Sequence, residues 1–218
     1  MIELDLINQM KTGPFRILCI GAHCDDIEIG CGGALLELQK RRKDMTINWV
    51  ILSSDEKRAA EAEKSAGRLL KGTKDFSLKN GVFKDGYFPY LGSEIKDFFE
   101  DLKKEMEPDL IFTHYRSDFH QDHRIVSELT WNTFRNHLIL EYEIPKYDGD
   151  MGSPNVYIQL DQGTCSEKID IIKSSYKTQE KKQWFDEETF WSLLRIRGIE
   201  ANSRYKYAEG FYCRKIVF

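Results

Sequence analysis

Two short stretches of the sequence carry side chains suited to metal chemistry. Residues 21–33 read GAHCDDIEIGCGG, directly after the apolar run FRILCI, and residues 114–123 read HYRSDFHQDH, directly after DLIFT. One histidine and one aspartate from the first stretch, with one histidine from the second, form a set of two imidazoles and one carboxylate. That set suits zinc with an open fourth position for water, and it also has the composition of a non-haem iron(II) site. The ligand types therefore predict a metal site and leave zinc and iron as alternatives.

The second stretch is expected to begin a helix that places two histidines on one face. Asp118 is suited to capping that helix, with Gln121 three residues later, and His120 and His123 then lie three positions apart. A helix N-terminus disfavours a charged imidazole, so it favours the neutral histidine that a metal requires. Asp122 is a candidate to orient one of the two rings through a hydrogen bond.

The first stretch allows other interpretations. Adjacent aspartates after a strand also fit a magnesium-binding phosphoacceptor site, although that site would leave the histidines without a role. The glycines at 30–33 lack the spacing GxGxxG, so we interpret them as a tight turn that lets the backbone pass close to a ligand and starts a helix. Cys24 has candidate ligands on both sides, which favours a structural role over a thiolate ligand or nucleophile.

Apolar runs and helical stripes alternate along most of the chain. The predicted strands are 15–22, 45–54, 109–114, 139–144 and 154–160, and the predicted helices are 32–43, 55–72, 93–108, 121–138, 166–176 and 187–198. Residues 73–89 are expected to be mostly loop, with room for a short strand, and 207–218 have some strand character. Such alternation predicts an α/β fold, with a mainly parallel sheet and helices on both faces, in a single domain over residues 1–218. Ligands of open parallel sheets bind at the carboxyl ends of strands, so both polar stretches are expected to meet there.

The composition disfavours a nucleic-acid-binding, a membrane-spanning and a disulfide-bonded protein. The 218 residues include 32 Lys plus Arg and 36 Asp plus Glu, for a net charge of −4, which disfavours nucleic acid as a partner. No apolar run is long enough to span a bilayer and the first residues do not resemble a signal peptide, so we expect a cytoplasmic protein. The five cysteines lack the spacing of a disulfide framework and are expected to be reduced. A homo-oligomer stays open, because tryptophans such as Trp131 suit either an interface or the core.

The two motifs together resemble a known family. AHCDDIEIGCGG resembles the AHPDDE…GCGG signature of the PIG-L/LmbE-type zinc-dependent N-acetyl-sugar deacetylases, and HQDH resembles their His-x-Asp-His motif. The ending RIRGIEANSRYKYAEGF is similar to the family's R-x-G…YAE-x-F region. Two departures are Cys24 in place of proline and Ile27 in place of glutamate, with Glu28 one position late. We expect Glu28 to point away from the metal, toward the surface or the substrate.

The resemblance implies a Rossmann-like sheet and metal-assisted hydrolysis of an N-acetyl group. Asp25 matches the general base, His120 the histidine that helps to stabilise the oxyanion, and Asp122 the aspartate that orients this histidine. The implied metal ligands, for Zn²⁺ or alternatively Fe²⁺, are His23, Asp26 and His123.

The substrate is expected to be a small-molecule N-acetyl sugar or glycoconjugate. Arg58 and Asp85 resemble polar positions that the family uses to grip its substrates, and Arg197 lies in the similar C-terminal region. Two rival functions stay open. One is an amidase that cleaves a larger acyl or thiol conjugate, and the other is a degenerate sugar-binding domain, which only Ile27 favours.

Overall fold

The computed structural model describes residues 13–217, which form seven strands, six α-helices and two 3-10 helices. The strands are β1 (Phe15–Gly21), β2 (Met45–Ile51), β3 (Asp75–Asn80), β4 (Leu110–His114), β5 (Leu138–Tyr142), β6 (Val156–Leu160) and β7 (Tyr207–Cys213). The α-helices are α2 (Asp26–Arg41), α3 (Glu56–Leu69), α4 (Gly92–Glu105), α5 (Gln121–Thr133), α6 (Gln162–Ser175) and α7 (Glu187–Glu200), and the 3-10 helices are η1 (Phe88–Tyr90) and η2 (Lys177–Gln179). No helix between residues 13 and 217 is long and apolar enough to cross a membrane.

All seven strands belong to one sheet in the order β3-β2-β1-β4-β5-β7-β6. The first five run parallel, whereas β7 is antiparallel to both of its neighbours, β5 and β6. The α/β architecture with a mainly parallel sheet is therefore confirmed. The late strand β7 enters between β5 and β6, so the alternation of strand and helix breaks down at this edge.

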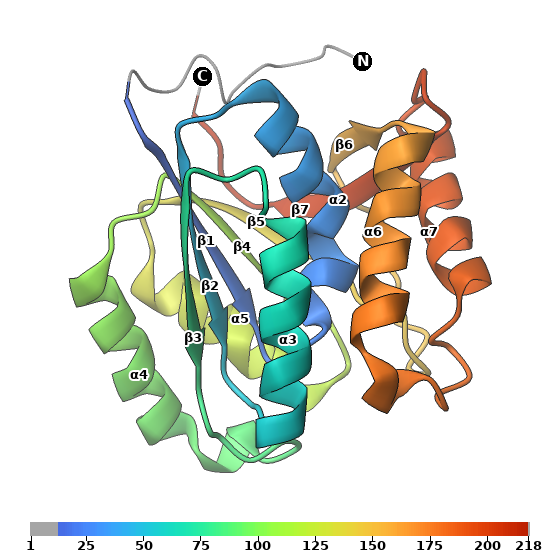
Figure 1. Cartoon of the computed structure of the whole chain (residues 1–218). Helices are drawn as coiled ribbons and strands as arrows, with labels where there is room; N and C mark the ends of the chain where they lie inside the picture. The colour runs from blue at the N-terminus through green and yellow to red at the C-terminus, as the bar shows by residue number, and fades with distance from the viewer. Residues whose placement is uncertain (1–12, 218) are drawn as a thin grey trace.

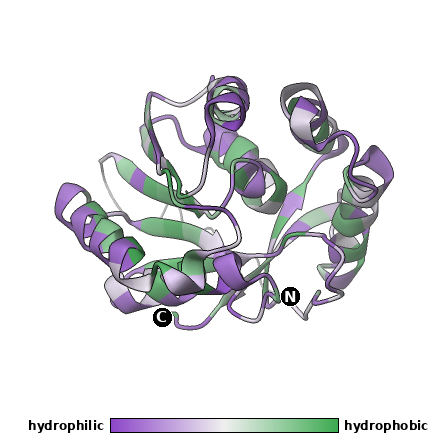
Figure 2. Ribbon diagram, turned by 90° about the horizontal axis from the view of Figure 1, so that it is seen from below, coloured by the Kyte–Doolittle hydropathy of each residue, from purple (hydrophilic) through white to green (hydrophobic). Residues whose placement is uncertain are grey.

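Each face of the sheet is buried under helices (Figure 1). Along β1, Ile17 and Cys19 belong to the apolar cluster beneath α2, α3, α6 and α7, whereas Leu18 and Ile20 belong to the cluster beneath α4 and α5. This alternation explains why β1 has no polar side chain after Arg16, since both of its faces are covered. Figure 2 shows apolar stretches of the strands between the two helical layers, with more polar residues on the outer sides of the helices.

The strand order reverses its direction between β1 and β4. From β1 the chain passes through α2 to β2 on one side, and it later returns through α4 to β4 on the other side. The carboxyl ends of β1 and β4 therefore lie side by side, and His114 Nε2 at the end of β4 lies 2.9 Å from the backbone nitrogen of Ala22 after β1. Adjacent connections diverge at this point, which is where open sheets bind ligands.

The start of α2 differs from the prediction. The helix begins at Asp26 and not near residue 32, so the glycines at 30, 32 and 33 lie within it and do not form a turn. They allow close packing instead. A Cβ at Gly30 would lie 2.1 Å from the ring of Tyr142, and one at Gly33 would lie 2.5 Å from Leu160.

Three other boundaries also differ. Residues 75–80 form the edge strand β3, which is largely exposed and therefore lacks an apolar signal. Helix α5 ends at Thr133, five residues before the predicted end. Helix α6 begins at Gln162 and not at 166, because Asp161 accepts a hydrogen bond from the backbone N–H of Thr164 and caps it.

Candidate metal centre

Four of the five histidines in the sequence gather at the carboxyl ends of β1 and β4. His23 follows β1, His114 ends β4, and His120 and His123 stand at the start of α5. The ring centroid of His123 lies 5.3 Å from that of His23, 3.9 Å from that of His114 and 4.5 Å from that of His120. The two polar stretches therefore meet as predicted.

His23, Asp26 and His123 bring three potential ligand atoms to one point, all within 4.8 Å of one another. His123 Nε2 lies 3.2 Å from His23 Nδ1 and 3.6 Å from Asp26 Oδ1. Asp26 Oδ2 also accepts a 2.7 Å hydrogen bond from the backbone N–H of His23, which fixes the loop between the two side chains. All three residues are buried, so their side chains are held in place by the surrounding protein.

The second nitrogen of each imidazole faces a carboxylate. His123 Nδ1 lies 2.9 Å from Asp118 Oδ2, and His23 Nε2 lies 3.0 Å from Asp85 Oδ1. A proton on each of these nitrogens leaves Nε2 of His123 and Nδ1 of His23 free as lone pairs toward Asp26. The predicted helix cap at Asp118 is wrong. Its Oδ1 accepts from the backbone N–H of His120, and its Oδ2 is occupied by His123 and Lys146.

His114 lies beneath this group and is fully buried. Its Nε2 is 3.1 Å from Asp26 Oδ2 and 3.3 Å from the hydroxyl of Tyr142. Tyr142 donates to the carbonyl of Ile20 at 2.6 Å, and it reaches this position only because Gly30 presents no side chain to its ring. The packing of α2 on β5 therefore supports the floor of the site.

Asp25 lies beside the three candidate ligands, with 5 % of its surface exposed. Burial raises the pKa of its carboxyl, the neighbouring Asp26 raises it further, and Arg58 acts in the opposite direction. Arg58 lies 3.3 Å from Asp25 Oδ1 and 3.3 Å from Asp85 Oδ2, so it joins the two carboxylates. The structure thus brings Arg58 and Asp85 to the site, in contact with its acidic residues.

The two imidazoles at the start of α5 are both disposed to be neutral. Burial and the neighbouring His114 lower the pKa of His123 to about 3, which keeps its ring available as a ligand. Burial and His23 also lower the pKa of His120. His120 Nδ1 is buried and has no hydrogen-bond partner among residues 13–217.

Asp122 is fully buried and holds a neighbouring loop. Its carboxylate accepts from the backbone N–H of Gly86 at 2.6 Å and of Phe88 at 3.1 Å, and it lies 3.4 Å from His23 Nε2. Asp122 and His120 belong to one group of potential ligand atoms, but no hydrogen bond joins them in the described part of the chain. The contacts of Asp122 are thus with His23 and the loop that carries Asp85.

The two departures from the family motif both point away from the candidate ligands. Ile27 is fully buried in the core, and the thiol of Cys24 faces the carbonyl of Ser53, with burial raising its pKa to about 12. Glu28 does point away from the metal group, but the expectation that it faces surface or substrate is wrong. Its side chain is fully buried against Tyr176, and burial raises its pKa to about 8.

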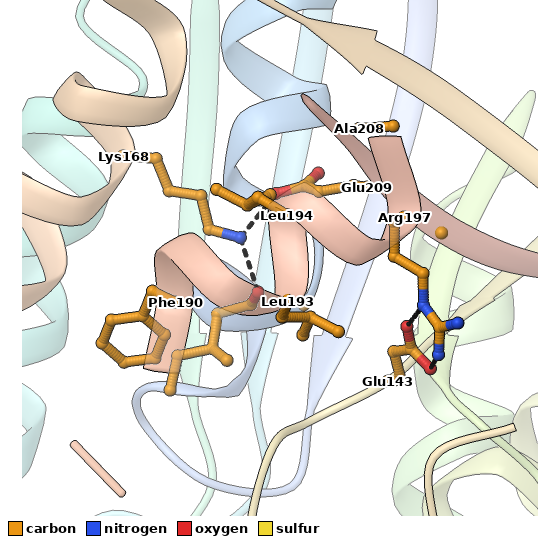
Figure 3. A pocket seen from close by; sticks show the side chains of 11 residues that line it. Glu143, Lys168, Phe190, Leu193, Leu194, Arg197, Ala208 and Glu209 are labelled. Atoms are coloured by element: carbon orange, nitrogen blue, oxygen red, sulfur yellow. Dashed lines mark hydrogen bonds and ion pairs between the residues drawn. The ribbon is translucent and has the colours of Figure 1, made fainter. Parts of the chain in front are cut away.

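Arg197 is not brought to this group. Its guanidinium makes two hydrogen bonds to Glu143 and two to Glu200, and 4 % of its surface is exposed. With Lys168 and Glu209 it lines a cavity of about 20 Å³ (Figure 3), far below the volume of an ordinary ligand pocket. The similar C-terminal region thus supplies buried ion pairs in this structure.

Sequence reasoning missed three residues that support the candidate ligands. Asp118 was assigned to a cap, and Tyr142 and Lys146 were not singled out. Lys146 lies 3.0 Å from Asp118, in a loop more than twenty residues away along the chain. The sequence shows an aspartate at position 118 but not which group it accepts from. An aspartate shortly before a helix can cap that helix or accept from a histidine in its first turn, and the spacing of Asp118 and His123 fits both.

The fold occurs in solved structures of several activities. The N,N'-diacetylchitobiose deacetylase of Pyrococcus horikoshii is 23% identical, with a TM-score of 0.70 over 96% of this chain and 87% of that chain. A zinc-inhibited form of teicoplanin deacetylase is 14% identical, with a TM-score of 0.70 over 91% and 97%. The 4-carboxy-2-hydroxymuconate hydratase of Pseudomonas putida is 16% identical, with a TM-score of 0.73 over 94% and 98%. These likenesses establish the fold.

A sequence family carries the assignment further. No curated protein sequence matches the chain significantly. The profile of the family described as PIG-L, GlcNAc-PI de-N-acetylase, matches residues 18–134, which is more than half of the chain and includes both polar stretches. The chain therefore belongs to the PIG-L family.

Proposed function

We propose that this protein is a metal-dependent deacetylase that removes the acetyl group from an N-acetylated amino sugar or glycoconjugate. The observation that carries the proposal is the convergence of His23 Nδ1, Asp26 and His123 Nε2 beside the unligated carboxylate of Asp25. The family match and the two deacetylases of the same fold support it.

The residues present fit a zinc ion. Two imidazoles and a carboxylate are a common set for catalytic zinc, and each imidazole has a carboxylate at its other nitrogen. Two further His/Asp groups occur among residues 13–217, but each shares a histidine with this set. His123 Nδ1 faces Asp118 and His23 Nε2 faces Asp85, whereas the other nitrogen of each ring faces Asp26. One site is therefore better supported than two.

Zinc, when bound, acidifies water and polarises an amide carbonyl. Asp25 takes the proton from the attacking water, and Arg58 stabilises the ionised form of Asp25 that accepts this proton. Asp25 then returns the proton to the departing amine. His120, as a neutral imidazole, donates its ring N–H to the oxygen on which negative charge develops, a contact typically worth a hundredfold or more in kcat.

The rival function of a degenerate binding domain is weaker on structural grounds. Ile27, the one feature that favours a degenerate binding domain, packs in the core and removes nothing from the candidate ligands. The hydratase of the same fold shows that the fold does not by itself specify amide hydrolysis, so the assignment depends on the site. A panel of substrates with acyl groups of different length, including thiol conjugates, would distinguish the amidase from the deacetylase.

The deciding experiment compares metal content and deacetylation in four proteins. Wild type is expected to hold about one zinc per chain and to release free amine from at least one N-acetyl sugar in a panel that also includes longer acyl groups. Asp25→Asn should retain zinc and lose at least a hundredfold in kcat, whereas His123→Ala should lose both zinc and activity. His137→Ala is the matched control, because His137 is the one histidine outside the cluster. Full activity in Asp25→Asn or His123→Ala would refute the assignment.

A further inference from the structure

Tyr176 connects the end of α6 to the loop that carries the site. Its hydroxyl lies 2.6 Å from the carbonyl oxygen of Cys24 and 2.5 Å from Glu28 Oε1. Tyr176 and Glu28 are both almost fully buried, so no solvent competes for these bonds. Neither contact takes part in the chemistry proposed above.

The backbone carbonyl oxygen of Cys24 can only accept, so Tyr176 donates its hydroxyl hydrogen to it. Glu28 Oε1 lies 2.5 Å from the same hydroxyl and holds it from α2. Tyr176 therefore links α2 to the backbone after β1.

The carbonyl of Cys24 and the N–H of Asp25 belong to the same peptide plane. Holding this carbonyl therefore fixes the direction in which the backbone enters Asp25, the residue immediately before α2. Arg58 holds the side chain of Asp25 at 3.3 Å, and Asp26 holds the backbone N–H of His23. Tyr176 contacts the peptide between Cys24 and Asp25, which neither Arg58 nor Asp26 holds.

We propose that Tyr176, through its bond to the Cys24 carbonyl and with its hydroxyl held by Glu28, is a positioning residue for Asp25. The effect on catalysis rests on the proposed function, but the positioning itself does not. The acidic residue, which stands at position 28 here and at the position of Ile27 in the family motif, has a role in this arrangement because it contacts Tyr176. One position on a helix is a rotation of about 100°, which turns position 28 toward Tyr176 and position 27 into the core.

The test compares Tyr176→Phe with a control that removes a hydroxyl elsewhere. Tyr157→Phe serves as the control, because its hydroxyl donates to the carbonyl of Pro154 at the β6 edge, outside the site. Tyr176→Phe is expected to keep its zinc and its circular dichroism spectrum, with KM within about twofold and kcat lowered about 10- to 100-fold, since a small misplacement of a catalytic group has effects of this size. Tyr157→Phe should match wild type in all four.

A second readout does not depend on activity. Hydrogen exchange of the segment 22–26 should be faster in Tyr176→Phe and unchanged in Tyr157→Phe, because only the first variant releases the Cys24 carbonyl. Glu28→Gln should keep near-normal exchange and kcat, since an amide of the same size can still form a hydrogen bond with the tyrosine hydroxyl. Glu28→Leu cannot form it and should behave like Tyr176→Phe.

Unchanged kcat and unchanged exchange in Tyr176→Phe would overturn the positioning role. A wild-type protein that hydrolyses no member of the panel would instead count against the proposed function, and the exchange measurement would still decide whether Tyr176 holds the loop.

Discussion

Replacing Gly30 by alanine tests whether the packing of α2 on β5 supports the metal site. Alanine is a better helix former than glycine by about 0.5–1 kcal/mol, so the substitution would stabilise an unobstructed helix. At Gly30 the new Cβ would lie 2.1 Å from one ring atom of Tyr142 and 2.4 Å from another, although ordinary contacts begin at 3.4 Å. The ring must therefore retreat by more than 1 Å.

The retreat is costly because Tyr142 is held at its other end. Its ring is fully buried, and its hydroxyl donates to the carbonyl of Ile20 at 2.6 Å. Overpacking a core of this kind costs about 1–3 kcal/mol, and loss of a buried hydrogen bond costs about 1–2 kcal/mol more. After subtraction of the helix gain, Gly30→Ala should destabilise the protein by about 1–4 kcal/mol.

Gly67→Ala is the matched control. Gly67 lies within α3, where a Cβ would have no neighbour within 4 Å, so only the helix gain applies and the variant should be more stable by up to about 1 kcal/mol. The assay is urea unfolding. The midpoint urea concentrations of the two variants report stability provided that their m-values are equal. Because Tyr142 contacts His114, Gly30→Ala should also bind zinc more weakly than Gly67→Ala. A midpoint raised in both variants would refute this account of Gly30.

Two further predictions concern the support of His123 and the pH dependence of stability. Asp118→Ala should lower zinc affinity about 10- to 100-fold, measured by competition with a chelator, because His123 loses its acceptor, whereas Asp148→Ala on the exposed part of the next loop should leave it unchanged. Burial raises the pKa of Glu141 in the folded protein, so its contribution to stability is present below the ordinary glutamate pKa and is lost as pH rises through the raised value. Glu141→Gln should therefore show a smaller fall in the free energy of unfolding above about pH 5, and an unchanged slope would contradict this.

Much of the fold could be predicted because the central strands are buried on both faces. β1 and β4 are buried at every or almost every position, and α3 and α4 between them each have one buried stripe, so their types and order could be predicted. β3 was not, because half of its residues are exposed and the rest only partly buried, which gives an edge strand no apolar pattern. The insertion of β7 between β5 and β6 depends on contacts far apart in sequence, which no local pattern reveals.

The sequence predicted where the polar groups of the site lie better than it predicted their hydrogen-bond partners. The topology alone brings the loops after β1 and β4 together, and His23 and His123 meet there. Residue types could not distinguish a cap from a histidine acceptor at Asp118, nor an exposed substrate contact from a buried ion pair at Arg197. The first distinction depends on how the ring of His123, five residues later, is turned, and the second depends on Glu143, which lies 54 residues earlier in the chain.

The acidic residue displaced by one position shows why helix boundaries matter more than motif letters. If α2 began near residue 32, residues 27 and 28 would lie in a loop, and either side chain could turn toward the metal. Because α2 begins at Asp26, the two side chains point about 100° apart and cannot replace each other. Residue 27 belongs to the core, and residue 28 meets Tyr176, which is 148 residues later in sequence. The departure from the motif therefore changes how the loop before α2 is held, while His23, Asp26 and His123 keep their mutual geometry.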